Sequence, residues 1–119
     1  MAVSREFRDF VEELLAAFGP VQIKPMFGGA GIHADGVNFG LISEDTLYLK
    51  VDDGNRAAFE AEGMSPFVYQ GRNKPVSMSY WQVPDRLLDD PEGMADWAHA
   101  ALAAARRAKP TKTIRRKRA

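Results

Sequence analysis

Apolar residues recur at three- and four-residue spacing along residues 4–18, and at two-residue spacing in several later stretches. The first spacing predicts an amphipathic helix, because residues so spaced share one helical face. Ser4 is suited to cap the N-terminus of this helix, and Gly19-Pro20 is suited to end it. One side of the helix is therefore expected to pack against the rest of the chain.

The two-residue spacing predicts strands, because successive side chains of a strand point to opposite faces. Pro25 confines the first strand to a sheet edge or a bulge. Asp35-Gly36 is a strong hairpin signal, and Glu44-Asp45 is a second short turn, so neighbouring strands are expected to pair antiparallel. The candidate strands cover residues 21–27, 30–34, 37–43, 46–51, 64–69 and 76–83.

A short helix is expected between the fourth and fifth of these stretches. Asp52 or Asp53 can cap it, and it ends near Gly63. Its alanines are small enough to let it pack closely against the sheet, and they are Ala57, Ala58 and Ala61.

The last helix begins at Asp90-Pro91-Glu92, which combines an N-cap, a proline at the first helical position and an acid near the positive end of the helix dipole. Pro110 is expected to close this helix. Its predicted buried stripe comprises Met94, Trp97, Ala98, Ala101, Leu102 and Ala105.

Together these elements predict an α+β fold. We expect an antiparallel sheet of about five strands, with the N- and C-terminal helices packed on one face and one short helix between strands. One domain is expected over residues 1–109, with a flexible basic tail over residues 110–119. The tail contains one large apolar residue and no periodicity, so it lacks the means to form a core.

Composition and charge narrow the class of protein. The 119 residues are 45% hydrophobic and 27% charged, as in a globular protein, and no apolar run is long enough to span a membrane. Acidic residues near the N-terminus rule out a secretory signal peptide, and the absence of cysteine excludes thiolate chemistry, so a cytoplasmic location is expected.

The net charge of +0 conceals a strong asymmetry. Residues 97–119 hold eight bases and no acid, whereas residues 1–96 hold eight bases and all sixteen acids. The body is therefore acidic and the C-terminal segment basic. Such an asymmetry bears on the choice of partners rather than on the fold.

Several blocks of the sequence together resemble one known family. They run from about residue 4 to 108 and occur in the family's order. The blocks are Met26-Phe27-Gly28-Gly29-Ala30-Gly31-Ile32, Asp35-Gly36 with Phe39, Leu47-Tyr48-Leu49-Lys50-Val51-Asp52, Gly63-Met64 with Pro66-Phe67 and Tyr69, Met78-Ser79-Tyr80-Trp81-Gln82-Val83-Pro84, and Asp90-Pro91-Glu92 with Trp97. This pattern resembles the N-terminal domain of the TfoX/Sxy family.

The resemblance implies a regulatory protein. Two-domain members of the family act in natural competence, as activators or co-activators of transcription that work with the cyclic-AMP receptor protein. Here the resemblance covers the N-terminal domain alone, so we expect a stand-alone domain with a short basic tail in place of the C-terminal domain. The family implies no catalytic motif. We therefore expect a non-enzymatic regulator or adaptor that acts through a protein partner, such as transcription machinery.

The glycine-rich stretch admits a second hypothesis. The backbone N–H groups of Gly28, Gly29 and Gly31 could bind an anion or nucleotide, flanked by Lys24 and Lys50, in a small binding module or enzyme. However, productive phosphate loops open a helix, and this stretch lies between two strands. The structural interpretation is a tight turn or bulge that needs positive φ angles.

Other candidate chemistry is sparse. His33 and His99 lack the partners that a metal or an acid–base role requires. Ser65, Ser77 and Ser79 lie outside any nucleophile motif. We expect no catalytic residue, no metal and no cofactor.

Aromatic residues gather in the last two strands. Tyr80-Trp81 and Phe67 with Tyr69 could form an exposed platform, or they could pack in the core. Strand alternation turns one of Tyr80 and Trp81 outward. Because the body is acidic, an outward aromatic residue favours a protein partner over RNA.

The basic tail predicts weak, non-specific contact with nucleic acid through Lys112, Arg115, Arg116, Lys117 and Arg118. The alternative is that the tail stays solvated or folds back on the acidic body. A homodimer is compatible with the sequence, and a membrane partner is not expected.

Overall fold

The computed structural model describes residues 4–26, 29–70 and 75–114, without the side chains of residues 26, 69–70, 75–78 and 109–114. Six strands and several helices follow the order predicted from the hydrophobic pattern. The elements are α1 (Arg5–Leu14), the 3-10 helix η1 (Leu15–Ala17), β1 (Gln22–Met26), β2 (Gly29–Ala34), β3 (Val37–Ser43), β4 (Thr46–Lys50), α2 (Arg56–Ala61), β5 (Pro66–Gln70), β6 (Pro75–Gln82), the 3-10 helix η2 (Asp85–Asp89) and α3 (Pro91–Ile114).

All six strands form one antiparallel sheet in the order β1-β2-β3-β4-β6-β5. The prediction of an α+β fold with an antiparallel sheet is confirmed. β1 lies at one edge, so Pro25, which has no N–H to donate, interrupts no ladder on its outer side. Hairpins join β1 to β4 in sequence, and β6 then pairs between β4 and the other edge strand, β5.

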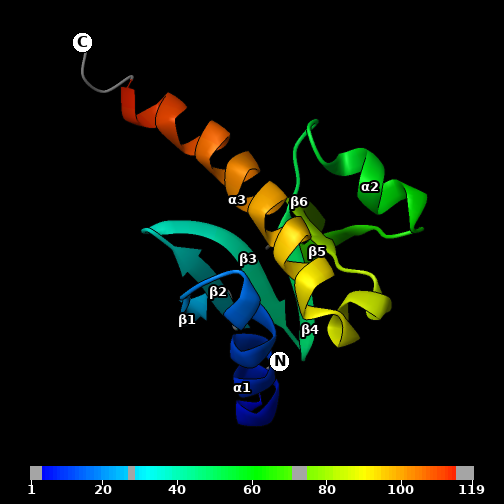
Figure 1. Ribbon diagram of the computed structural model, residues 1–119. Helices are drawn as coiled ribbons and strands as arrows, with labels where there is room; N and C mark the ends of the chain where they lie inside the picture. Colours follow the sequence, from blue (N-terminus) through cyan, green and yellow to red (C-terminus); the bar gives the residue numbers. More distant parts are fainter. Residues whose placement is uncertain (1–3, 27–28, 71–74, 115–119) are drawn as a thin grey trace.

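The helices cover one face of the sheet, as predicted. Figure 1 shows α1 and α3 in front of the strands, with α3 running obliquely across them. Alternate residues of the inner strands face these helices and are fully buried, among them Ile32, Phe39 and Leu49. From the helices, Val11, Leu15, Met94 and Ala98 complete the same core. At about 25 cal/mol per Å², this burial is the main favourable contribution to folding.

Two tight turns fix the register of the inner hairpins. Asp35 and Gly36 both have positive φ angles, 54° and 76°, which match the primed turn that the sequence predicted. Glu44 and Asp45 adopt the same region at 51° and 56° without a glycine. The carboxylate of Asp45 accepts a hydrogen bond of 2.9 Å from the N–H of Ser4, so this turn also anchors the start of α1. The Ser4 hydroxyl accepts from the N–H of Phe7 at 3.1 Å, which confirms the predicted N-cap.

The short helix α2 differs from its prediction in two ways. It begins after Asn55 rather than at Asp52 or Asp53, because the carboxylate of Asp52 accepts from the N–H of Gly54 and shapes the preceding turn. The alanines predicted to pack, Ala57, Ala58 and Ala61, are exposed. Phe59 supplies the packing instead, with its ring at 4.7 Å from that of Trp97 and 6.2 Å from that of Trp81.

The start of α3 is as predicted, since the carboxylate of Asp90 accepts from the N–H of Gly93 at 3.0 Å. Its predicted end at Pro110 is wrong. The helix continues to Ile114, because a proline inside a helix removes one hydrogen bond but keeps a helical φ angle. Residues 110–114 of the predicted tail therefore belong to α3, and residues 115–119 lie outside the described part of the chain. The domain boundary at residue 109 stays a prediction.

Candidate functional site

The sheet has a second face, opposite the core, on which no described helix packs. Tyr48 and Lys50 alternate with the core residues of β4 and so point to this helix-free face, and Tyr80 lies directly opposite Lys50 on β6. On β2 and β3 the same alternation places His33 and Asn38 there. α2, η2 and α3 all contribute to the single core cluster on the other side. Two of the sequence blocks that carry the family resemblance, residues 47–52 and 78–84, thus supply this face.

A row of polar side chains crosses four strands of the helix-free face. The hydroxyl of Tyr80 donates a hydrogen bond to the side-chain oxygen of Asn38. The amide nitrogen of Asn38 lies 3.4 Å from Nε2 of His33, a long contact. Nδ1 of His33 is buried and has no hydrogen-bond partner among the described residues. We name the four residues Tyr80, Asn38, His33 and Lys50 the polar row.

Lys50 is the only cation of the polar row. Its Nζ donates to the hydroxyl of Ser79 at 2.6 Å and lies 5.2 Å from the centre of the Tyr80 ring. Burial lowers the pKa of Lys50, and the nearby Asp52 opposes this effect. Burial also raises the pKa of Tyr80, so its hydroxyl stays protonated at neutral pH and remains a donor.

An aromatic pair borders the polar row. The rings of Tyr48 and Phe67 meet edge to face at 4.9 Å, and the fully buried Leu41 lies opposite Tyr48 on β3. Burial, and secondarily the charge of Glu44, raise the pKa of Tyr48. The helix-free face therefore combines one ammonium group and fixed hydrogen-bonding groups with partly exposed aromatic rings, which suits a binding surface.

The glycine-rich stretch does not form the turn that the sequence predicted at Gly29 and Gly31. Both lie in β2 without positive φ angles, and Gly28 lies outside the described residues. Gly31 pairs with Lys24 on β1 and with Leu41 on β3, so its backbone belongs to the sheet on both sides. Gly29 is required for another reason, since a Cβ there would stand 2.1 Å from the carbonyl oxygen of Ile42.

The lysines proposed to flank an anion at this stretch lie apart from each other. Lys24 is exposed on the edge strand β1, and Lys50 is on β4, with β2 and β3 between them. The structure therefore brings Lys50 together with Ser79 and Tyr80, not with the glycines.

The remaining candidates are placed as follows. Trp81 packs on the core, while its neighbour Tyr80 faces the other way, as strand alternation requires. His99 is exposed on α3 and stacks near Phe18, with ring centres 4.6 Å apart. The side chains of Ser77 and Tyr69 lie outside the described residues. In the part of the chain that the structure describes, no three His, Asp or Glu side chains gather in a way that could hold a metal ion.

The basic end of α3 contacts the acidic body. Arg107 donates two hydrogen bonds to the carboxylate of Asp52, at 2.6 and 2.8 Å, and Arg106 donates one to Asp35 at 2.8 Å. The Arg107 contact is the main reason that the pKa of Asp52 is lowered to about 2. These pairs occupy two of the eight C-terminal bases.

Figure 1 shows the last turns of α3 projecting beyond the sheet. Of the predicted nucleic-acid contacts, the Lys112 side chain and residues 115–118 lie outside the described part.

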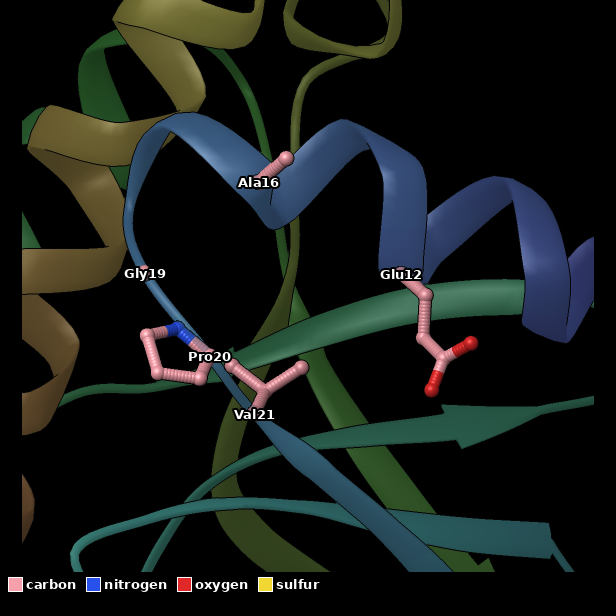
Figure 2. Close-up of a pocket in the computed structure, with 5 residues that line it drawn as sticks. All are labelled: Glu12, Ala16, Gly19, Pro20 and Val21. Carbon is pink, nitrogen blue, oxygen red and sulfur yellow. The ribbon is translucent and has the colours of Figure 1, made fainter.

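Two hollows lie at the N-terminal side of the sheet. Figure 2 shows the larger, about 390 Å³, where the carboxylate of Glu12 extends from α1 toward the strands near Val21. The smaller, about 260 Å³, shares Pro20 and Val21 and reaches His33 at the end of the polar row. Neither lining brings together a nucleophile with a base that orients it, which acyl or phosphoryl transfer would require.

Within residues 4–26, 29–70 and 75–114, no helix combines the length and the apolar character needed to cross a membrane.

Comparison with known proteins places the chain in a family. The TfoX N-terminal domain matches residues 13–105, which is most of the 119 residues. No match is found among the curated proteins. The family match supports, in general terms, a regulatory role of the kind linked to competence. The matched span begins within α1, ends within α3 and includes the whole sheet. The chain belongs to the TfoX N-terminal domain family.

Proposed function

We propose that this chain is a non-enzymatic cytoplasmic regulator that binds a protein partner on the helix-free face of its sheet, as an adaptor linked to transcription. The observation that carries the proposal is that the polar row, whose side chains come from four strands, lies beside the aromatic pair Tyr48 and Phe67. Aromatic rings are groups that protein interfaces favour, and a fixed charge adds specificity to such an interface.

A protein partner suits this face better than nucleic acid does. Residues 1–96 carry sixteen acids against eight bases, so the body repels phosphate chains. Lys50 is the one base in the polar row, and a single base gives little counterion release. The aromatic rings would instead bury apolar area against a folded or extended protein segment.

The proposed binding face is tested by using the immobilised chain to capture partner proteins from the cytoplasm of the source cell. The variant Tyr48→Ser removes a ring of the aromatic pair, and Phe10→Ser is a matched control that removes an exposed ring from α1, on the other side of the molecule. We expect wild type and Phe10→Ser to retain the same protein, and Tyr48→Ser to retain about ten-fold less, since central aromatic residues dominate interfaces. Circular dichroism checks that both variants are folded.

The proposed face would be wrong if Tyr48→Ser retained the partner fully while Phe10→Ser lost it. Binding would then lie on the helical side. No retained protein with folded wild type would instead contradict the adaptor role itself.

A second contact is proposed for the C-terminal bases. Lys112, Arg115, Arg116, Lys117 and Arg118 follow the two arginines that pair with the body, and no acid interrupts them. Lys112 belongs to the end of α3 that projects beyond the sheet, and the other four bases follow α3 in the sequence. We expect weak contact with nucleic acid that is independent of base sequence.

Salt dependence tests this contact. If about five phosphates engage, binding of wild type to duplex DNA should weaken more than a hundredfold between roughly 50 and 200 mM salt. A variant with those five bases changed to glutamine should bind weakly at both concentrations. Equal binding by the two proteins would remove nucleic acid from the proposed function.

The anion- or nucleotide-binding module remains a second hypothesis, now with less support at its proposed position. Gly29 and Gly31 are strand residues, and Lys24 and Lys50 do not converge on them. The observation that still favours an anion is Lys50 itself, on the opposite side of β3 from the glycines.

A further inference from the structure

We infer that Lys50 is the anchor for a carboxylate group that the protein partner supplies, held at the ammonium by Ser79 and Tyr80. The inference rests on the proposed function and names the chemistry of the partner at that face. It is carried by the surroundings of one side chain.

Lys50 is a partly buried cation that forms no direct ion pair with an acidic side chain. All sixteen acidic side chains of the protein lie among the described residues, yet none forms an ion pair with Lys50. By contrast, Arg86, Arg106 and Arg107 each pair with a carboxylate, although each is about half exposed. A cation that loses part of its hydration is stabilised by an opposite charge. The acidic group that acts on Lys50 is the nearby Asp52, and both oxygens of its carboxylate already accept hydrogen bonds from Arg107.

The groups around Lys50 fix its position. Its backbone carbonyl accepts a hydrogen bond of 3.0 Å from the side chain of Asn55, which is buried. The ring of Tyr80 lies under the ammonium and is held in place by its hydroxyl bond to Asn38. Ser79 accepts one of the three ammonium protons. No second acceptor for the ammonium is found among the residues that the structure describes, so two donors can serve an acceptor from outside.

The chemistry favours a carboxylate over a phosphate. One ammonium balances the single charge of a carboxylate, whereas phosphate carries more charge and is best bound by bidentate guanidinium groups. The acidic body also repels a doubly charged group more strongly than a singly charged one. An acidic side chain or a chain terminus, followed by apolar residues that reach Tyr48 and Phe67, fits this surface.

The test compares Lys50→Met, which keeps the apolar stem over Tyr80, with Lys24→Met, which removes an exposed lysine from β1. In the capture experiment, we expect Lys50→Met to retain at least about ten-fold less partner than wild type, and Lys24→Met to retain the same amount. If Tyr48→Ser loses the partner and Lys50→Met keeps it, the carboxylate anchor is wrong and the adaptor function stands.

Titration with sodium acetate, followed by amide NMR, tests the anchor without a partner. We expect saturable shifts of the amides of residues 50, 79 and 80 in wild type and Lys24→Met, and none in Lys50→Met. Equal shifts in Lys50→Met would overturn the inference. A second titration uses inorganic phosphate. If phosphate saturated these shifts at a lower concentration than acetate does, the inference that the bound group is a carboxylate would be wrong.

Discussion

Changing Gly29 to alanine is expected to lower the free energy of unfolding by about 3 kcal/mol. The new Cβ would stand 2.1 Å from the carbonyl oxygen of Ile42, which is a backbone atom of the neighbouring strand. Side chains can rotate away from such a contact, but this carbonyl cannot move without opening the pairing of β2 with β3. Urea denaturation measures the loss as a lower midpoint at unchanged slope.

Gly54→Ala is the matched control for this substitution. Its added Cβ would meet Nη2 of Arg107 at 2.7 Å, which is the far end of a flexible side chain. We expect a loss below about 1 kcal/mol, because Arg107 is exposed and can shift. A Gly29→Ala protein as stable as wild type would contradict the close approach of the two strands.

Changing Phe59 to alanine is expected to destabilise the protein by about 3–5 kcal/mol. Phe59 is 1% exposed and contacts the rings of both tryptophans, Trp81 and Trp97, which are the only two in the chain. Its loss removes most of what attaches α2 to the core. Denaturation followed by tryptophan fluorescence reports the loss directly, and the folded-state spectrum should shift toward that of solvent-exposed indole.

Two control substitutions distinguish the loss of the Phe59 ring from a general disturbance of helix α2. Phe59→Leu keeps much of the volume and should lose less than Phe59→Ala. Ala58→Ser, one residue away on the exposed side of α2, should change stability by less than about 0.5 kcal/mol. If Ala58→Ser were the more damaging change, α2 would pack through its alanines, contrary to the structure.

Much of the fold could be predicted from local pattern. Ser4 and Asp90 cap their helices, Asp35-Gly36 forms the hairpin turn and Pro25 lies at a sheet edge, because each effect acts over a few residues. The sequence predictions fail where contacts between residues far apart in the sequence determine the packing. Phe59 packs α2 because Trp81 and Trp97 approach it from other elements, and its three alanines stay exposed.

The candidate site was predicted only in fragments. Lys50 and the outward turn of Tyr80 could be identified from alternation along single strands. The contacts of Tyr80 with Lys50 and with Asn38 depend on β6 pairing with β4, a long-range pairing that local pattern does not encode. The sequence predicts a tight turn or bulge with positive φ angles at the glycine-rich stretch, because sequence alone does not reveal the carbonyl of Ile42 beside Gly29.

The central claim, that a partner binds the helix-free face, is tested most directly by hydrogen exchange of the captured complex. Slower amide exchange is predicted at residues 46–50 and 79–82, the segments of β4 and β6 that carry Tyr48, Lys50 and Tyr80. Residues of α1 and the exposed side of α3 should exchange as in the free protein. Protection confined to α1 and α3, with β4 and β6 unchanged, would contradict the claim.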